Sequence, residues 1–316
     1  MHHVLIDELF PPYLLGAIDQ NEYQLHVWRD DQKFAAEILP NIEAALLHGH
    51  FKVDGALLDR LPKVRIIVCF GRGTDHIKHE DARKRGIPVA SLPANILDET
   101  VADMAMGLML AVARNIVTGY RYAKGPDFTA FDPSLFVGSN VTGKTLGIVG
   151  MGNVGYQVAR RGHFGFDMPV LYFSRHRKPE ADGIGAIYAP LSDLLTRSDF
   201  VVLTLPISES TRLMIGEPEI ALMKPTAYLI NVGRGGTVNH DALTKALIAR
   251  RIAGAALDVT DPEPLPRDHP LLALDNLVIT PHISSATIET RSRMGQIAAE
   301  HLKAGLRGES LLHQLV

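Results

Sequence analysis

Residues 146–155 read Leu-Gly-Ile-Val-Gly-Met-Gly-Asn-Val-Gly and carry the strongest structural signal in the chain. Residues 146–149 predict a buried strand, and residues 150–155 follow as G-x-G-x-x-G before a helical stretch. In this context the first glycine permits a tight turn, the second lets a pyrophosphate approach the backbone, and the third lets helix and strand pack closely. The helix N-terminus then faces the phosphates with free N–H groups. A dinucleotide site is favoured over a merely structural turn, with contacts from Gly150, Met151, Gly152, Asn153, Val154 and Gly155.

A second glycine-containing stretch lies just upstream. Residues 138–145, Gly-Ser-Asn-Val-Thr-Gly-Lys-Thr, match the spacing of a P-loop. That motif needs a strand before it and a helix after it. Here a loop precedes it and the predicted strand 146–149 follows it, so we expect a connecting loop with Lys144 on the surface.

Short apolar runs alternate with longer mixed segments on both sides of the glycine loop, a pattern typical of parallel α/β sheets. With 146–149, a set of six strands suits a dinucleotide-binding sheet; the other five are expected at 170–173, 200–205, 228–232, 252–257 and 277–280. In the first hundred residues, strands are expected at 4–6, 25–27, 55–57, 64–70 and 87–89, with a helix around 34–47. Further expectations are a helix over 98–117, a loop over 124–143 and a last helix over 286–306. The predicted fold class is α/β with two Rossmann-like parallel-sheet domains.

Length and composition narrow the functional classes. A chain of 316 residues favours two domains. The net charge of -3 argues against nucleic acid or an anionic membrane as a partner. Cys69 is the one cysteine, which excludes an intrachain disulfide and fits a reducing compartment. The longest apolar run, residues 104–113, is too short for a membrane helix, which needs about 20 residues. We expect a cytoplasmic protein.

The segment after the predicted strand 170–173 indicates which dinucleotide is bound. NAD enzymes usually present an acidic residue there to the ribose 2′-hydroxyl. This chain has Ser174-Arg175-His176-Arg177-Lys178 instead. An arginine can bind a 2′-phosphate through charge-assisted hydrogen bonds. The sequence therefore predicts NADP(H) in preference to NAD(H), held by Ser174, Arg175 and Arg177; the alternative is a solvated basic turn.

Three further residues each closely follow a predicted strand of the second series: Arg234, Glu263 and His282. Ligands of open α/β sheets bind at the carboxyl ends of the strands, so these side chains can converge. Reduction of a 2-oxo acid needs a cation for the carboxylate, which suits Arg234, and an acid for the carbonyl oxygen, which suits His282. Glu263 would favour the imidazolium and orient the ring. Alone, each could be a surface residue; together they predict a catalytic set that needs no metal.

The first domain offers a second half of the site. Gly71, Arg72 and Gly73 follow the strongest strand of that domain, 64–70, and their backbone N–H groups could bind a substrate carboxylate. An ordinary strand-to-helix turn is the alternative. At the ends of other strands we expect cofactor contacts from Leu205, Pro206 and Val232.

The glycine loop, residues 231–236 (Asn-Val-Gly-Arg-Gly-Gly), residues 257–264 and residues 280–287 together resemble the D-isomer-specific 2-hydroxyacid dehydrogenases. Phe173-Ser174-Arg175 resembles the NADPH-dependent glyoxylate/hydroxypyruvate reductase branch. The resemblance implies a flavodoxin-like substrate domain of residues 1–97 plus 287–316, a cofactor domain of residues 98–286, a cleft between them and a homodimer. It places Arg234, Glu263 and His282 on the catalytic positions, with Arg234 and His282 also touching substrate.

The same resemblance places Asp258 at the nicotinamide carboxamide and residues 71–73 at the carboxylate-binding turn. Two departures stand out: Arg72 replaces a small apolar residue, and Asn239-His240-Asp241 replaces the usual Asp-Glu at an expected helix start, where little catalytic effect is expected. The predicted activity is NADPH-dependent reduction of glyoxylate, hydroxypyruvate or the bulkier phenylpyruvate to a D-2-hydroxy acid. The alternatives are an NADP(H)-sensing corepressor-like protein, which need not keep the three catalytic residues, and a 3-phosphoglycerate dehydrogenase-like enzyme, which Arg175 disfavours.

Overall fold

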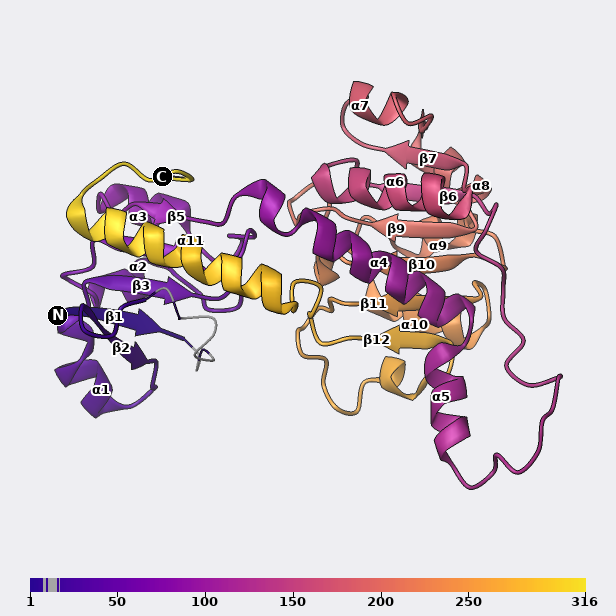
Figure 1. Ribbon diagram of the computed structural model, residues 1–316, viewed down its shortest axis with the longest axis horizontal. Helices are drawn as coiled ribbons and strands as arrows, with labels where there is room; N and C mark the ends of the chain where they lie inside the picture. Colours follow the sequence, from indigo (N-terminus) through magenta and orange to yellow (C-terminus); the bar gives the residue numbers. More distant parts are fainter. Residues whose placement is uncertain (8–9, 11–15, 17) are drawn as a thin grey trace. The chain divides into compact units, whose positions relative to one another are not determined.

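The computed structural model describes residues 1–7, 10, 16 and 18–316 (Figure 1). The chain forms two compact units. The first contains Met1–Leu97 and Ala286–Val316, and the second contains Asp98–Ser285. Each unit is built on its own parallel sheet, of five and seven strands respectively, so the predicted α/β fold class is confirmed.

The second unit has the topology of a dinucleotide-binding sheet, in the order β12-β11-β10-β9-β6-β7-β8. Its strands are β6 (Leu146–Val149), β7 (Val170–Phe173), β8 (Ile187–Tyr188), β9 (Phe200–Leu203), β10 (Tyr228–Asn231), β11 (Gly254–Leu257) and β12 (Leu277–Ile279). The strand order reverses between β6 and β9, which are neighbours in the sheet. A ligand crevice is expected at such a switch point.

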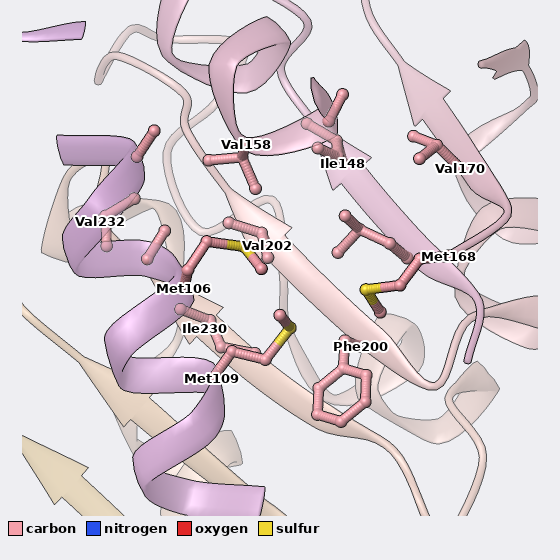
Figure 2. Close-up of a cluster of buried hydrophobic side chains, with 14 of the residues drawn as sticks. Met106, Met109, Ile148, Val158, Met168, Val170, Phe200, Val202, Ile230 and Val232 are labelled. Carbon is pink, nitrogen blue, oxygen red and sulfur yellow. The ribbon is translucent and has the colours of Figure 1, made fainter. Parts of the chain in front are cut away.

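The helical elements of this unit surround the sheet: α4 (Asp98–Ala113), α5 (Ile116–Lys124), α6 (Asn153–Phe166), α7 (Pro179–Asp182), α8 (Leu191–Arg197), α9 (Glu217–Leu222), η3 (Gly235–Thr237), α10 (His240–Ile248) and η4 (Pro270–Ala273). Met106 and Met109 of α4 point onto the sheet toward Val202 and Phe200 (Figure 2). These side chains are almost fully buried. Burying each such side chain stabilises the fold by roughly 1.5–3 kcal/mol, which makes the sheet a rigid base for its loops.

The first unit has the flavodoxin-like strand order β2-β1-β3-β4-β5. Its strands are β1 (His2–Ile6), β2 (Tyr23–Val27), β3 (Ala44–Leu47), β4 (Ile66–Cys69) and β5 (Val89–Ala90). Its helical elements are α1 (Gln32–Glu37), η1 (Leu39–Asn41), α2 (Gly55–Asp59), α3 (His79–Lys84), η2 (Ala94–Ile96) and α11 (Ile288–Arg307).

The last helix belongs to the first unit although it follows the second in sequence. Figure 1 shows α11, in yellow, lying along the sheet that contains β3. Gly305 permits this packing, because a Cβ there would lie 2.6 Å from Ile66 of β4. Thr287 caps the start of the helix, accepting from the Thr290 N–H, and Gly308 ends it with φ +70°.

Two local predictions in the first unit are wrong. Residues 55–57 form the start of α2 rather than a strand, because the Asp54 carboxylate accepts the Leu57 N–H and caps a helix. The helix expected over 34–47 ends at Glu37, close to Pro40, and residues 44–47 form β3 instead. This strand pairs with β1 and β4 and is buried on both faces.

Two predictions in the second unit need correction as well. The helix expected over 98–117 breaks after Ala113, since Asn115 adopts a left-handed φ of 52°, and α5 follows in a new direction. The sheet has a seventh strand, β8, whose two residues are exposed and too few to give a sequence pattern. No described helix is by itself long and apolar enough to cross a membrane; α4 and α5 reach that length and composition only as a pair bent by 62°.

Candidate active site

The strands of the second unit end in register, which brings the predicted site residues to one edge of the sheet. Asn231 pairs with Leu257, and Leu257 pairs with Ile279. On the other side of β10, Asn231 pairs with Leu203, which in turn pairs with Val149. Neighbouring strands lie about 4.8 Å apart, so the loops that follow them leave the sheet side by side.

The glycine loop joins β6 to α6, and two of its three glycines, Gly150 and Gly155, are required by the backbone and packing of the protein itself. Gly150 has φ +108°, and its N–H donates to the Phe173 carbonyl at 2.8 Å. A Cβ at Gly155 would lie 2.2 Å from the Gly150 carbonyl oxygen. Gly152 differs, because a Cβ there would meet nothing within 4 Å. Packing within the protein thus explains Gly155 but not Gly152, and the space beside Gly152 is where a ligand could approach.

The other residues of the loop occupy different environments. Met151 is buried in the hydrophobic core, so only its backbone can face a ligand. Asn153 begins α6 and is exposed. No side chain caps this N-terminus among the described residues, and the first turn of α6 carries no acidic residue. The N–H groups of the first turn are therefore suited to an anion.

Tight packing holds the neighbouring loops against the glycine loop. The Thr204 hydroxyl, just after β9, donates to the Gly150 carbonyl at 2.5 Å. A Cβ at Gly233 would lie 2.5 Å from the carbonyl oxygen of Leu205, the predicted cofactor contact beside Pro206. A Cβ at Gly235 would lie 2.0 Å from the Thr260 backbone. The loops after β6, β9, β10 and β11 therefore pack tightly against one another.

The predicted 2′-phosphate residues lie beyond β7, next to the glycine loop. The Ser174 hydroxyl donates to the His176 carbonyl and shapes the turn. Arg177 is exposed, and its Nε donates to Asp182 Oδ2 at 2.8 Å. Arg175 is exposed too and makes no ion pair with any residue that the structure describes. Of the two arginines, Arg175 is the less committed to a protein partner.

Arg234 lies three residues beyond β10 on a strongly restrained backbone. Its carbonyl accepts hydrogen bonds from the Asn231 amide at 3.0 Å and from the Thr237 hydroxyl at 2.7 Å. The side chain is half-buried, and one guanidinium nitrogen donates to the Gly233 carbonyl at 3.0 Å. Val232, which precedes this turn, is buried at the end of the strand. The guanidinium group of Arg234 is thus carried by a backbone that hydrogen bonds hold in place.

The expected helix start after this turn is confirmed. α10 begins at His240, and the Asn239 side chain accepts the Ala242 N–H at 3.0 Å, as a capping residue does. Burial lowers the pKa of His240, although the Val238 backbone and Asp261 oppose the shift. Asn239 therefore acts as the N-cap of α10.

His282 and Glu263 are in direct contact. The Nδ1 atom of His282 lies 2.9 Å from Glu263 Oε1. Both side chains are partly buried, with 36% of the His282 side chain and 22% of the Glu263 side chain exposed. A carboxylate on Nδ1 fixes the ring orientation and directs Nε2 away from it. The arrangement can hold a proton on the ring and deliver it from Nε2.

Asp258 lies at the end of β11 and is only 1% exposed. Its Oδ1 accepts the Thr280 hydroxyl at 2.6 Å and the Ile283 N–H at 2.9 Å. Its Oδ2 accepts the Ser284 N–H at 2.9 Å and also the Ser284 hydroxyl. Sequence reasoning missed Thr280, Ser284 and Thr204 as site residues. Hydroxyl residues on both sides of His282 were the available signal for the first two.

The predicted carboxylate-binding turn follows β4 in the first unit. Cys69, at the strand end, is buried and its Sγ donates to the Gly73 carbonyl at 3.3 Å. The Gly71 carbonyl accepts the Leu92 N–H at 3.1 Å. Arg72, between the two glycines, is exposed. The turn is therefore held by its carbonyls and by the strand beneath it.

Comparison with known proteins places this arrangement in a family. The model of the D-isomer specific 2-hydroxyacid dehydrogenase NAD binding domain matches residues 106–284. A glyoxylate reductase of Korarchaeum cryptofilum is 41% identical over 312 residues, covering 97% of this chain and 93% of the relative. The chain belongs to the D-isomer specific 2-hydroxyacid dehydrogenase family, and its second unit contains the NAD(P)-binding domain.

Solved structures agree with this assignment. A protein from Thermus thermophilus superposes with a TM-score of 0.91 at 36% identity, covering 99% of this chain and all of the other. An NADPH-dependent glyoxylate/hydroxypyruvate reductase from Sinorhizobium meliloti, solved with NADP and malonate, gives a TM-score of 0.86 at 29% identity, covering 100% of this chain and 97% of the other.

Proposed function

We propose that the protein reduces small 2-oxo acids to D-2-hydroxy acids with NADPH. The observation that carries the proposal is the contact of 2.9 Å between His282 Nδ1 and Glu263 Oε1, on loops at the same sheet edge as Arg234. This edge supplies an acid, a group that orients it and a cation. Reduction of a 2-oxo acid requires these groups.

Each of the three residues has a distinct task in the proposal. Arg234 binds the substrate carboxylate, because its planar fork matches two carboxylate oxygens. His282 donates a proton from Nε2 to the carbonyl oxygen as negative charge develops there. Glu263 orients the ring through its contact with Nδ1. On the first unit, the backbone N–H groups of Gly71, Arg72 and Gly73 are proposed to bind the carboxylate as well.

The residues beyond β6 and β7 suit NADP(H). The space beside Gly152 and the uncapped first turn of α6 fit a pyrophosphate. Arg175, Arg177 and Ser174 would face a 2′-phosphate, with Leu205, Pro206 and Val232 lining the rest of the cofactor. No acidic residue occurs in 174–178, where a carboxylate would repel the phosphate. When bound, the cofactor supplies the hydride that reduces the carbonyl carbon.

The names of the relatives support glyoxylate and hydroxypyruvate as the first substrates to test, and phenylpyruvate tests whether a bulkier group is accepted. We propose that the first unit binds substrate and the second binds cofactor.

We further propose a homodimer formed through the second unit. Several large apolar side chains on α5 and the segment after it are exposed: Ile116, Tyr120, Phe128, Phe131, Leu135, Phe136 and Val137. Monomers rarely expose apolar groups in such a cluster. Light scattering on wild type and Phe131→Asp should show a dimer that weakens in the variant; a monomeric wild type contradicts the proposal.

The activity is tested with a substrate panel. Purified protein is assayed with glyoxylate, hydroxypyruvate and phenylpyruvate, each with NADPH and with NADH. We expect turnover with NADPH at a kcat/KM well above that with NADH. Tight NADPH binding without turnover of any 2-oxo acid would favour a sensor. Equal use of both cofactors would contradict the role given to the basic segment.

A further inference from the structure

Two tyrosines hold the ends of the basic segment that follows β7. Tyr172 of β7 lies opposite Tyr188 of β8 in the sheet, and the two rings meet edge to face with their centroids 5.5 Å apart. The Tyr172 hydroxyl accepts the Lys178 N–H at 2.8 Å. The Tyr188 hydroxyl donates to the Ser174 carbonyl at 3.3 Å. The first and last residues of segment 174–178 are therefore bound by one pair of side chains.

The Tyr172 hydroxyl is the more firmly placed of the two, because its side chain is fully buried in the hydrophobic core whereas Tyr188 is exposed. It also lies 3.4 Å from the Lys178 carbonyl and 3.4 Å from Asp182 Oδ1, and it can donate to either. Burial raises the pKa of the Tyr172 phenol, the Lys178 backbone hydrogen bond opposes this shift, and Asp182 adds to it. The phenol therefore keeps its proton at neutral pH and can donate and accept at the same time.

Segment 174–178 belongs to no helix or strand, so side chains rather than regular backbone hydrogen bonds set its course. Within it, the Ser174 hydroxyl donates to the His176 carbonyl, and Arg175 is exposed. An arginine binds a phosphate well only when its planar fork is aligned with the phosphate oxygens, because hydrogen bonds weaken steeply with misalignment. The backbone that carries Arg175 therefore determines how well this side chain can meet a 2′-phosphate.

We propose that Tyr172 is a positioning residue for cofactor choice, whose hydroxyl fixes the course of residues 174–178 so that Arg175 meets the 2′-phosphate of NADPH. It rests on the proposed function for the place of the 2′-phosphate. Tyr172 is buried and acts through the segment rather than on the cofactor itself. NADH has a hydroxyl group in place of that phosphate, so its affinity does not depend on the Tyr172 hydroxyl.

The central test is Tyr172→Phe, which keeps the ring in the core and removes only the hydroxyl. We expect the Kd of NADPH, measured by fluorescence titration, to rise about 10-fold and the Kd of NADH to stay within about twofold of wild type. Tyr228→Phe is the matched control, because the buried Tyr228 of the same unit also loses a hydroxyl contact, at 3.1 Å from Ser139 Oγ. It should leave both dissociation constants unchanged. An equal rise of both constants in Tyr172→Phe, or no rise in that of NADPH, overturns the proposal.

A double-mutant cycle with Arg175→Ala tests whether Tyr172 acts through the arginine. If it does, Tyr172→Phe should raise the Kd of NADPH by less than about threefold in the Arg175→Ala background, compared with about 10-fold in the wild-type background. Independent contributions would multiply. An undiminished loss of NADPH affinity in the Arg175→Ala background therefore overturns the proposal.

A readout without turnover separates this proposal from the proposed activity. The 2′-phosphate and the pyrophosphate of bound NADP⁺ give separate phosphorus NMR signals, so the pyrophosphate serves as an internal control. We expect the 2′-phosphate signal to move toward its free position in Tyr172→Phe, while the pyrophosphate signals keep their wild-type positions. A 2′-phosphate signal at the wild-type position in Tyr172→Phe overturns the positioning role, even if 2-oxo acids are reduced.

The wild-type protein provides the remaining comparison. Equal affinity of the wild type for NADPH and NADH overturns both the proposed cofactor preference and the role of Tyr172, whereas failure to reduce any 2-oxo acid contradicts the proposed activity alone. If Tyr172→Phe does not fold, Tyr188→Phe, which removes the donor to the Ser174 carbonyl at the other end of the segment, is measured instead with the same criteria.

Discussion

Two glycines of the same loop should respond in opposite ways to the addition of one methyl group. Gly152→Ala places a Cβ where no protein atom lies within 4 Å, at φ -89° and ψ -165°, which alanine adopts freely. Alanine makes the unfolded chain less flexible, which stabilises the folded state by about 0.4–1 kcal/mol. Its weaker preference for the helix cap offsets this stabilisation. The stability of Gly152→Ala should therefore stay within about 1 kcal/mol of wild type.

Gly155→Ala places its Cβ 2.2 Å from the Gly150 carbonyl oxygen and 3.1 Å from Ile148 Cγ2. The backbone has to move, so α6 must shift away from β6. Overpacking of this kind lowers stability by about 1–3 kcal/mol. The higher helix preference of alanine offsets up to about 1 kcal/mol of this loss. For a unit of this size, each kcal/mol lowers Tm by roughly 2–4 °C.

The effect on cofactor affinity should be the reverse of the effect on stability, because Gly152→Ala is the variant that should bind NADPH more weakly. The Gly152→Ala methyl group occupies the space proposed for the pyrophosphate and breaks backbone hydrogen bonds to it. Hydrogen bonds to a charged group are worth about 1.5–3 kcal/mol, so the Kd of NADPH should rise roughly 10- to 100-fold. Calorimetry gives the stability, and quenching or enhancement of NADPH fluorescence gives the Kd. Wild-type NADPH affinity in Gly152→Ala, with wild-type stability in Gly155→Ala, would contradict the different roles given to the two glycines.

Three further predictions address charge. Arg175→Asp should shift the ratio of kcat/KM for NADPH over NADH by about 100-fold toward NADH, and Arg177→Asp by less, because Arg177 already pairs with Asp182; equal shifts would contradict this ranking. Glu263→Gln keeps a hydrogen-bond acceptor beside His282 Nδ1 but removes the charge that strengthens this hydrogen bond, so kcat with glyoxylate should fall by about 10-fold; an unchanged kcat argues against the pairing. Burial and the neighbouring His313 lower the pKa of His301 below 6.5. The unfolded chain therefore binds more protons than the folded chain below that pH, and the folded state loses stability as the pH falls. His301→Leu should therefore lose less Tm on acidification, and an equal loss contradicts the assignment.

The elements that the sequence predicted well are those whose signals are local. Residues 146–155 combine an apolar strand with glycines at fixed spacing, so strand, turn and helix follow from neighbouring residues. The strands at 44–47 and the helix at 55–59 were not predicted, because Ala-Ala-Leu-Leu contains no β-branched residue and short apolar runs suit both structures. Burial between β1 and β4 makes residues 44–47 a strand.

The site divides in the same way. Arg234, Glu263 and His282 could be selected because each follows a strand, and strand ends share one edge of a parallel sheet. The Asp258 carboxylate accepts hydrogen bonds from Thr280 and Ser284, and this arrangement depends on the left-handed backbone of His282. The residue types in the sequence do not indicate that backbone conformation. The contact of Thr204 with Gly150 likewise depends on the close approach of two loops.

The proposed D-specific reduction is tested by the chirality of the product that the wild-type protein forms from hydroxypyruvate and NADPH, with His282→Ala measured alongside. We expect stoichiometric oxidation of NADPH, D-glycerate as the product, and a single-turnover rate lower by about 100-fold or more in His282→Ala. L-glycerate, or NADPH that binds but is not oxidised by any 2-oxo acid, would contradict it.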